Sequence, residues 1–590
     1  MINEILQSLS PHQREFVQNE ADKIFVAAAP GSGKTYVTAV KLINELQTWD
    51  NDSCGIATLS FTNIAESEIS SKVASLTGGR IDAAKHPHFI GTLDGFINQF
   101  IFLPYGHLIL GCKGRPKLVG GPHGSFFRSD YIKGHFEYTG FDIDDSNKLI
   151  SLRRYPQPPW QNARTMNAII KSKKSFLRAG YANQYDANFI ALQLLIRYPI
   201  IARILARRFP YFIIDEVQDS TDLHLRLLQT IFEAGTKKIA FIGDLDQAIF
   251  GWNKADIDKL KAVVEPFTRL GLPDNRRSSQ EICDFVLPLS SHESMSAMND
   301  KVKNFTFKPR IIGYDDLPVA IDEFRSLLSQ EGVMETRDNV AILCRSTKLV
   351  ESVMKHVSGL TEVAAEIETN TERLWASDES YNELFIQGLA EIRNGHSKIG
   401  YDDMCRAIIQ KKQHKDIRPS DFTEIKDDYE LFDVRCALQV AIKEASQYEN
   451  LPVGEWSNYL NGILEADVLL NGVVFNCKQG IDDTIQDILN LKSSATVDLP
   501  LRIGTIHTAK GETIENVMVC IDKRFGNAKA YKTMISNSTR GVAQACTEEE
   551  MRVVYVGLTR ASKRVILAVP NVDLQVWRNF LFANKNTLVE

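Results

Sequence analysis

Long apolar runs, closely spaced cysteines and an excess of positive charge are all missing from this sequence of 590 residues. Nowhere do 18 apolar residues follow one another, which argues against a membrane-spanning helix and a membrane partner. The nine cysteines lie far apart, with no CxxC pair and no Cys/His cluster at zinc spacing. A reduced, cytoplasmic protein is therefore expected.

Charge and composition narrow the class of protein further. Lys and Arg number 68 against 74 Asp and Glu, and the net charge of −6 excludes a chain that binds nucleic acid through bulk positive charge. With 35 glycines and 20 prolines, the chain is neither fibrous nor of low complexity. At roughly 150 residues per domain, its length corresponds to about four domain-sized units, so more than one core is expected.

Two sets of short apolar runs, each ending in a polar turn, are the main structural signal. The first set covers residues 23–29, 54–60, 211–215 and 238–244, and the second covers residues 339–345, 501–507, 516–522 and 563–569. Because the runs alternate with helical stretches, they predict buried parallel strands, and ligands bind beyond the carboxyl ends of such strands. The sequence thus predicts an α/β fold with two parallel-sheet cores.

Two long stretches lack this pattern and interrupt the cores. Residues 103–196 include a Gly- and Pro-rich portion, and residues 361–496 have mostly helical periodicity. The second, mainly helical insert is expected to serve regulation or partner docking or, alternatively, stability alone. The predicted division is 1–102 and 197–277 for the first core, 103–196 for its insert, 278–360 and 497–590 for the second core, and 361–496 for its insert.

The strongest local signal follows the first apolar run and consists of Ala28, Ala29, Pro30, Gly31, Ser32, Gly33, Lys34 and Thr35. The glycines let backbone N–H groups close around phosphate oxygens, Lys34 neutralises phosphate charge, and the Thr35 hydroxyl is a Mg²⁺ ligand. This pattern predicts a P-loop that binds ATP with Mg²⁺. A plain glycine-rich turn is the alternative, because Ala28 replaces the first glycine of the general pattern.

Two further polar clusters follow apolar runs. Asp215 and Glu216 come after residues 211–214, where an Asp binds Mg²⁺ and the adjacent Glu activates water. An acidic pair at a strand end is otherwise commonly a solvated turn, and the P-loop favours the catalytic interpretation. Gln247, after the run 238–244, is a candidate contact to the γ-phosphate or the attacking water.

Ten segments in order resemble the motifs of superfamily 1A DNA helicases of the UvrD/Rep/PcrA type. They are LSPHQREFV, AAAPGSGKT, LSFTN, GTLDGF, IIDEVQDS, GDLDQAIFGW, DNRRSS, LCRST, GTIHTAKGET and VVYVGLTRASKRV. They cover both cores but neither insert. The resemblance implies two RecA-like cores, of which the first binds ATP.

The resemblance also implies roles at the ATP site. Gln13 would read adenine, Lys34 and Thr35 would hold phosphate and Mg²⁺, Asp215 would bind Mg²⁺, and Glu216 would activate water. Gln247 would sense the γ-phosphate, and the arginine fingers, which stabilise the phosphoryl transition state from the second core, would be Arg277 and Arg560.

Two of the implied nucleotide contacts depart from the family pattern. Arg276 replaces a tyrosine that usually stacks on adenine, although a guanidinium also stacks. Glu512 stands one position away from the family's ribose-binding glutamate, so it either takes that role or points elsewhere.

For single-stranded DNA, the resemblance implies aromatic faces for bases and polar side chains along the same track. The aromatic residues are Phe61, Phe250 and Trp252, and the polar residues are Asn63, Thr92 and His507. For Phe250, packing in the core is the stronger alternative.

These observations predict a single-strand-stimulated ATPase that acts as a DNA helicase or translocase, 3′ to 5′ by resemblance. The alternative is a nucleotide-dependent regulatory subunit of a partner nuclease with little processive unwinding. The KGET form of motif V (Lys510–Thr513) more softly resembles the helicase-like subunit of Gabija antiphage defence. Such an ATP-driven helicase can serve either antiphage defence or DNA repair. The expected substrate is tailed duplex DNA, and in defence the expected partner is a nuclease or another subunit of the system.

Overall fold

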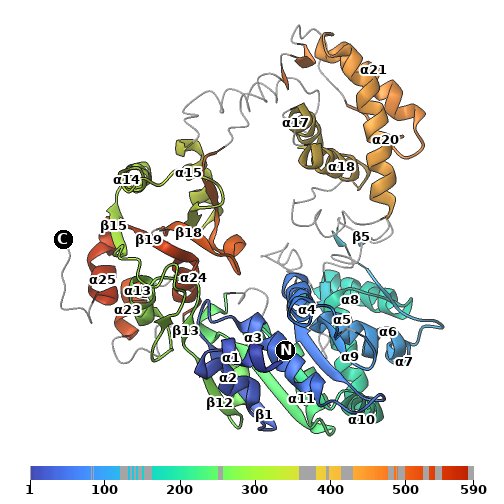
Figure 1. Ribbon diagram of the computed structural model, residues 1–590. Coiled ribbons are helices and arrows are strands. Elements are labelled where there is room, and N and C mark those ends of the chain that lie inside the picture. The colour runs from blue at the N-terminus through green and yellow to red at the C-terminus, as the bar shows by residue number, and fades with distance from the viewer. Residues whose placement is uncertain are drawn as a thin grey trace. The chain divides into compact units, whose positions relative to one another are not determined.

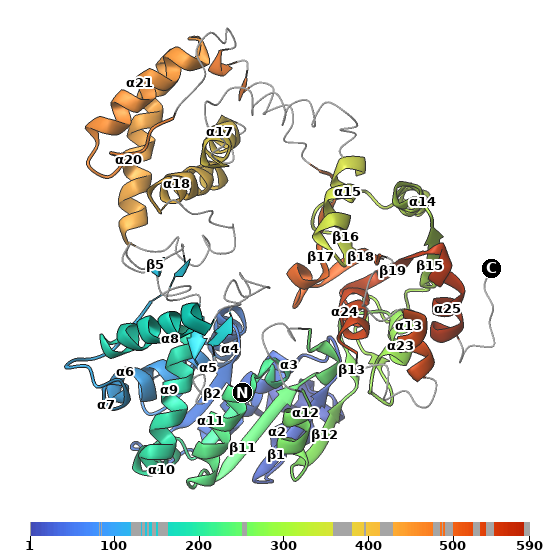
Figure 2. The ribbon, with the colours of Figure 1, turned by 180° about the vertical axis from the view of Figure 1, so that it is seen from behind.

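The computed structural model describes most of the chain (Figures 1 and 2). The residues outside the description are 1, 82, 84, 120–130, 133–135, 138–140, 144–148, 152–162, 250–256, 358–379, 394–396, 414–428, 476–483, 487, 490–498, 523–530, 539–547 and 583–590. The chain divides into two compact units. Unit 1 comprises residues 1–109, 188–356 and 499–590, and unit 2 comprises residues 110–187 and 357–498.

The first core of unit 1 is built on a parallel sheet of strand order β12-β1-β11-β10-β2-β3. Its strands are β1 (Lys23–Ala28), β2 (Ile56–Ser60), β3 (Phe89–Thr92), β10 (Tyr211–Ile214), β11 (Lys238–Gly243) and β12 (Thr268–Leu272). The four runs predicted as strands are confirmed as β1, β2, β10 and β11. Because they are parallel neighbours or next neighbours, the polar turns that follow them meet at one edge of the sheet.

Strand periodicity explains how helices cover both faces of this sheet. On one face, Ile24 and Val26 of β1 pack in a cluster with residues of α2 (Pro11–Gln18), α3 (Lys34–Gln47) and α4 (Asn63–Thr77). On the other face, Phe212 of β10 and Phe241 of β11 both contact Phe232 of α11 (Asp222–Glu233), with ring centroids 5.4 and 6.0 Å apart. The buried apolar runs therefore form the middle layer of the core.

The second core of unit 1 is a parallel sheet of order β15-β19-β18-β16-β17. Its strands are β15 (Arg310–Tyr314), β16 (Val340–Cys344), β17 (Arg502–Thr505), β18 (Ile514–Cys520) and β19 (Ala561–Pro570). Residues of α13 (Gln280–Val286), α23 (Tyr531–Ser538), α24 (Glu549–Leu558) and α25 (Asn571–Leu581) pack in one apolar cluster with residues of β15, β16, β18 and β19. The predicted fold class, an α/β protein with two parallel-sheet cores, is confirmed.

Smaller elements complete unit 1. The helices are α1 (Ile2–Ser8), α5 (Leu93–Ile97), the π-helix η1 (Asn98–Phe102), α6 (Leu103–Tyr105), α10 (Pro199–Arg208), α12 (Ile257–Val264), α14 (Leu317–Gln330) and α15 (Thr347–Val357), with α7 (His107–Leu110) at the boundary. The short helical turns are η4 (Val217–Asp219), η5 (Leu245–Gln247), η7 (Leu287–Leu289) and η9 (Ile506–Ala509), and β13 (Asp274–Asn275) pairs in parallel with β14 (Ser296–Ala297).

Unit 2 contains two parts of the chain that lie far apart in sequence. The later part is helical in its described residues, as predicted, with α17 (Ser380–Arg393), α18 (Ser397–Gln413), α20 (Tyr429–Ala445), η8 (Ser446–Tyr448) and α21 (Val453–Ala466). A Cβ atom at Gly388 of α17 would lie 2.6 Å from the backbone oxygen of Gly400 in α18. Glycine at this point therefore permits the two helices to pack closely.

The earlier part of unit 2 combines short strands with helices. The strands are β4 (Lys117–Leu118), β5 (Tyr131–Ile132), β6 (Phe136–Glu137), β7 (Phe141–Ile143), β8 (Leu149–Ser151) and β9 (Tyr181–Ala182), and the helices are α8 (Ala163–Arg178) and the start of α9 (Gln184–Arg197). A buried ion pair joins Lys173 Nζ to Asp186 Oδ2 at 2.7 Å. Within the described residues, no single helix has the length and apolar character to cross a membrane, although α9 and α10, bent by 101° at their junction, pass that test together.

Candidate ATP-binding and hydrolysis site

The predicted P-loop runs from the end of β1 to the start of α3. Gly31 and Gly33 have φ values of 69° and 77°, in the left-handed region that favours glycine. A Cβ atom at Gly31 would lie 2.7 Å from Arg277 Cβ and 2.9 Å from Asn275 Oδ1. Only glycine lets this loop pack so closely against the segment that carries Arg277.

Lys34 and the two acids of the next strand end lie together. Lys34 Nζ is 3.8 Å from Glu216 Oε1, and the Glu216 backbone takes a left-handed φ of 54° directly after β10. Burial would raise the pKa of Glu216, but the charges of Lys34 and Lys510 and a hydrogen bond from Gln218 together lower it. Glu216 is therefore ionised at neutral pH, as a proton acceptor must be.

Asp215 has the opposite electrostatic character. It is fully buried, and burial, followed by the charge of Glu216, raises its pKa to about 7. Its Oδ1 accepts the Glu216 N–H at 3.0 Å, whereas its Oδ2 is buried without a hydrogen-bond partner among the described residues. The charge of Lys34 and a hydrogen bond from the Thr35 side chain oppose the shift. The Asp215 carboxylate is therefore incompletely neutralised, and its Oδ2 is the oxygen without a hydrogen-bond partner among the described residues.

These features fit a bound Mg²⁺. A hard divalent cation takes carboxylate and hydroxyl oxygens as ligands, and Asp215 Oδ2 and the Thr35 hydroxyl are oxygens of this kind beside the P-loop. The cation would also stabilise the ionised form of Asp215. When bound, it supplies positive charge to the phosphate oxygens of the nucleotide.

Gln247 is tied to the acids by a chain of hydrogen bonds. Its Nε2 donates to Asp244 Oδ2 at 2.6 Å, and the Asp244 N–H donates to Gln218 Oε1 at 3.1 Å. Gln218 in turn donates to the Glu216 carboxylate. The predicted phosphate sensor and the predicted base therefore belong to one network at the sheet edge.

The second core brings Arg560 to this network. Arg560 is 1% exposed, its Nε donates to Val556 O at 2.9 Å, and its Nη2 donates to Gln247 Oε1 at 3.3 Å. Burial, followed by the charge of Arg277, lowers the pKa of Arg560 well below its usual range. A buried guanidinium repelled by a second one is stabilised by a polyanion such as triphosphate.

Arg277 lies between the P-loop and the second core. Its Nε donates to Thr513 Oγ1 at 2.9 Å and its Nη1 donates to Thr559 O at 3.0 Å. Burial lowers its pKa to about 10, and the charge of Glu216 opposes this shift. The two predicted arginine fingers are therefore near each other and near the predicted base.

Gln13 and Arg276 meet at the other side of the P-loop. Gln13 Nε2 donates to Ser32 O at 2.9 Å, and Gln13 Oε1 accepts from Arg276 Nη2 at 3.2 Å. The Arg276 N–H donates to Gly31 O at 2.8 Å. Both residues are thus held against the loop, and their roles toward adenine stay predictions.

Glu512 pairs with a residue of its own core. Its carboxylate accepts from Arg502, with Glu512 Oε1 3.0 Å from Arg502 Nη2. The role of Glu512 toward the ribose stays a prediction.

Several functional contacts escaped sequence reasoning. Lys510, in the turn after η9, pairs with Asp219 of η4 at 2.8 Å, which joins motif V to motif II across the cores. Asp244, Asp246 and His292 place one ligand-type atom each within 4.8 Å of one another. The helicase-like motifs of the sequence contain four of these residues, Lys510, Asp219, Asp244 and Asp246, so the motifs could have pointed to them. His292 lies in none of the motifs.

The candidate DNA residues are described only in part. Phe61 follows β2 and packs against His224, with ring centroids 5.8 Å apart. Thr92 ends β3, pairs in register with Ser60, and caps α5 by accepting the Gly95 N–H at 3.0 Å. These two residues therefore lie at adjacent strand ends.

The remaining candidate DNA residues give less information. His507 lies in η9, and burial, together with the charge of Arg345, lowers its pKa. Phe250 and Trp252 lie outside the described residues, as does the side chain of Asn63, which begins α4. Their roles stay predictions.

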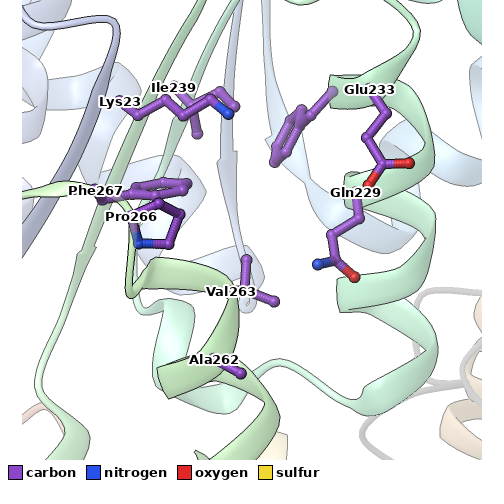
Figure 3. A pocket seen from close by; sticks show the side chains of 9 residues that line it. Lys23, Gln229, Glu233, Ile239, Ala262, Val263, Pro266 and Phe267 are labelled. Atoms are coloured by element: carbon purple, nitrogen blue, oxygen red, sulfur yellow. The ribbon is translucent and has the colours of Figure 1, made fainter.

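A separate cavity of about 240 Å³ lies near the amino-terminal ends of strands in the first sheet (Figure 3). Lys23 and Ile239, the first and second residues of β1 and β11, line it together with residues of α11 and α12. Because the P-loop and the acids follow the other ends of the strands, this cavity is not part of the candidate ATP site.

Comparison with known proteins agrees with this geometry. The UvrD/REP helicase N-terminal domain matches residues 9–108 and 142–268, and the UvrD-like helicase C-terminal domain matches residues 476–571. Together the two matches cover a little more than half of the chain. The chain belongs to the UvrD-like helicase family.

Individual relatives are more distant. The Gabija protein GajB of Bacillus cereus is 26% identical over 351 residues, which cover 58% of this chain and 61% of GajB. The ATP-dependent DNA helicase UvrD1 of Mycobacterium leprae is 23% identical over 414 residues, covering 60% of this chain and 49% of UvrD1. DNA helicase II of Salmonella typhimurium is 23% identical over 295 residues, covering 48% and 40%. The chain thus spans less than two thirds of the length of each.

Proposed function

We propose that this protein is an ATP-dependent DNA helicase or translocase whose ATPase is stimulated by single-stranded DNA and which moves 3′ to 5′. The observation that carries the proposal is the contact of Arg560, from the second core, with Gln247 of the first core, 3.3 Å apart and beside Glu216 and Lys34. Membership of the UvrD-like family supports the same activity.

The proposed reaction is attack of water on the γ-phosphorus. Lys34 and the P-loop N–H groups hold the phosphates, and Thr35 and Asp215 would hold Mg²⁺, which would supply positive charge to the phosphate oxygens. The water oxygen bonds to phosphorus as the bond to the β–γ bridging oxygen breaks, and Glu216 accepts the proton of the water. Arg560 and Arg277 stabilise the charge that spreads over the γ-phosphate oxygens in the transition state.

This division of labour couples chemistry to motion. Hydrolysis requires groups of both cores, so it proceeds only when the second core is seated on the first. Repeated seating and release would move the two cores relative to a bound strand that contacts Phe61, Thr92 and His507. A coupled pair of cores is the basis of a motor.

One strand-displacement assay tests the proposal. The purified chain with ATP and Mg²⁺ should unwind duplex DNA that carries a 3′ single-stranded tail and should leave 5′-tailed and blunt duplexes intact. The Glu216→Gln chain is the matched control and should unwind none of them. Unwinding from 5′ tails alone would refute the polarity.

A second candidate function is a nucleotide-dependent regulatory ATPase subunit of a partner nuclease. Similarity to the Gabija protein GajB supports this candidate and a place in antiviral defence, while UvrD1 and DNA helicase II match the chain at a similar identity. DNA-stimulated ATP hydrolysis without strand displacement by the chain alone would support it. The expected cytoplasmic location and the domain boundaries stay predictions.

A further inference from the structure

His292 lies where the second core covers the loop that carries Gln247. It follows η7 of the second core, and its side chain is 11% exposed. Its Nε2 lies 3.2 Å from Asp244 Oδ1 and 3.8 Å from Asp246 Oδ2. Both carboxylates belong to the first core and are 1% exposed. A side chain of one core therefore contacts two buried charges of the other.

Asp244 controls the orientation of Gln247. Because Gln247 Nε2 donates to Asp244 Oδ2, its Oε1 is left to accept from Arg560. The amide group has one donor side and one acceptor side, so loss of the Asp244 contact would let it turn over. Asp244 also reaches Glu216 through Gln218. A shift of this one carboxylate would therefore disturb both the sensor and the base.

Neighbours of His292 fasten the same loop. The Ser291 N–H donates to Asp246 Oδ2 at 2.7 Å, and the Ser291 hydroxyl donates to the same carboxylate at 2.9 Å. On the far side of Gln247, Arg552 Nε donates to Ala248 O at 2.7 Å. The second core thus holds residues 244–248 on both sides of Gln247.

The charges at this contact are matched. Burial would raise the pKa of Asp244, but His292 and Lys34 lower it, so the carboxylate stays ionised. Burial would lower the pKa of His292, but Asp244 and Asp246 raise it. The two carboxylates therefore favour the protonated imidazole, which forms an ion pair with them.

We propose that His292 is a positioning residue for ATP hydrolysis, which fixes the Asp244 carboxylate and through it Gln247 and Glu216 when the second core is seated. The inference rests on the proposed ATPase function. According to this inference, efficient ATP turnover requires His292, a residue of the second core that lies in none of the motifs, whereas nucleotide binding depends on the first core.

Substitutions of His292 test the proposal through the separation of kcat from KM. With single-stranded DNA and ATP, His292→Ala should lower kcat at least about tenfold, since a misplacement of about 1 Å costs on the order of a hundredfold. KM for ATP and the affinity for a fluorescent ATP analogue should stay within about twofold. His292→Gln keeps an N–H donor and should restore most of kcat. His356→Ala is the control, because it removes a surface pair to Asp322 of the same type, 2.7 Å long.

A second comparison separates positioning from mere packing. In a Gln247→Ala background, His292→Ala should lower kcat much less than it does alone, because its effect passes in large part through Gln247. If His292→Ala does not fold, His292→Gln and His292→Asn replace it, and only the shorter Asn should lose turnover.

The outcomes distinguish this inference from the proposed function. A wild-type chain without ATP turnover would contradict both. An active wild type with a normal His292→Ala variant, equal losses in the Ala and Gln variants, or an undiminished loss in the Gln247→Ala background would contradict the role of His292 alone.

Discussion

The two cores share one architecture, a parallel sheet between helices, yet they contribute opposite charges to the site. The first core contributes mainly carboxylates at its strand ends, from Asp215, Glu216, Asp219, Asp244 and Asp246. The second core contributes cations that meet them, from Arg560, Lys510 and His292. The difference supports the proposal that neither core is complete as an ATPase and that the cations of the second core offset the carboxylates of the first.

This comparison predicts that substitutions in the two cores fail in different ways. Lys34 and the P-loop belong to the first core and contact phosphate in the ground state, so their loss should weaken binding. Cations of the second core act on charge that develops in the transition state, so their loss should slow turnover with binding preserved.

The largest effects are expected in the first core. Lys34→Ala should abolish turnover by weakening phosphate binding, whereas Glu216→Gln should keep ATP bound and lower kcat by about 10²–10⁴-fold, the range for a general base. Steady-state ATPase rates and equilibrium binding of a fluorescent nucleotide measure both. A Glu216→Gln chain that hydrolyses ATP at the wild-type rate would show that another group accepts the proton.

Arg277 should give a smaller loss than Lys34→Ala, which abolishes turnover, and it sharpens the comparison. Arg277→Ala removes the hydrogen bonds to Thr513 and Thr559 together with one finger. We expect kcat to fall on the order of a thousandfold, the lower range for arginine fingers, with little change in ATP affinity. Thr513→Val removes only the support of Arg277 Nε and should have a milder effect of the same type. Parallel losses of affinity and rate would place Arg277 with the ground-state contacts.

The DNA contacts should give a moderate effect that leaves the ATP site intact. Trp252→Ala and Phe61→Ala should each weaken single-strand binding by roughly 1–3 kcal/mol and lower DNA-stimulated but not basal ATPase. Fluorescence anisotropy with labelled oligonucleotides measures the loss. Normal DNA stimulation in both variants would contradict a stacking role.

The smallest effect concerns pH. Burial lowers the pKa of His292, but Asp244 and Asp246 raise it above its usual 6.5, so its stabilising contribution is fully present below pH 6.5 and is lost as pH rises through the folded-state value. Lys34, which also faces this group, acts in the same direction as burial. The wild type should unfold a few degrees above His292→Gln near pH 6, and the gap should narrow at alkaline pH. A gap that widens with pH would reverse the assignment of charge.

Much of the fold follows from patterns that a sequence displays. Most of the confirmed strands, such as β1 and β10, are apolar runs in sheet interiors, and their buried residues make the signal continuous. In the two large sheets, the strands that were not predicted are β3, β12 and β15, and all three lie at sheet edges. β12 has only Leu272 buried, so the apolar signal of an edge strand is diluted.

The site shows the same limit. Sequence motifs predicted the P-loop, Asp215, Glu216 and Arg560, because the order and spacing of these motifs are typical of ATP-hydrolysing helicases. The contact between His292 and Asp244 joins residues 48 positions apart in different cores, and it depends on how those cores pack. The sequence around His292 does not indicate this contact, because the polar neighbours Ser291 and Glu293 are typical of a solvent-exposed loop.

The most direct test of the division between the cores compares Arg560→Ala with Lys34→Ala. ATP affinity and single-turnover hydrolysis are measured on each chain with saturating single-stranded DNA. The account predicts that Arg560→Ala binds ATP within a few fold of the wild type and hydrolyses it about a thousandfold more slowly, whereas Lys34→Ala loses affinity. Arg560→Ala with normal single-turnover hydrolysis, or with a loss of affinity that matches Lys34→Ala, would contradict the account.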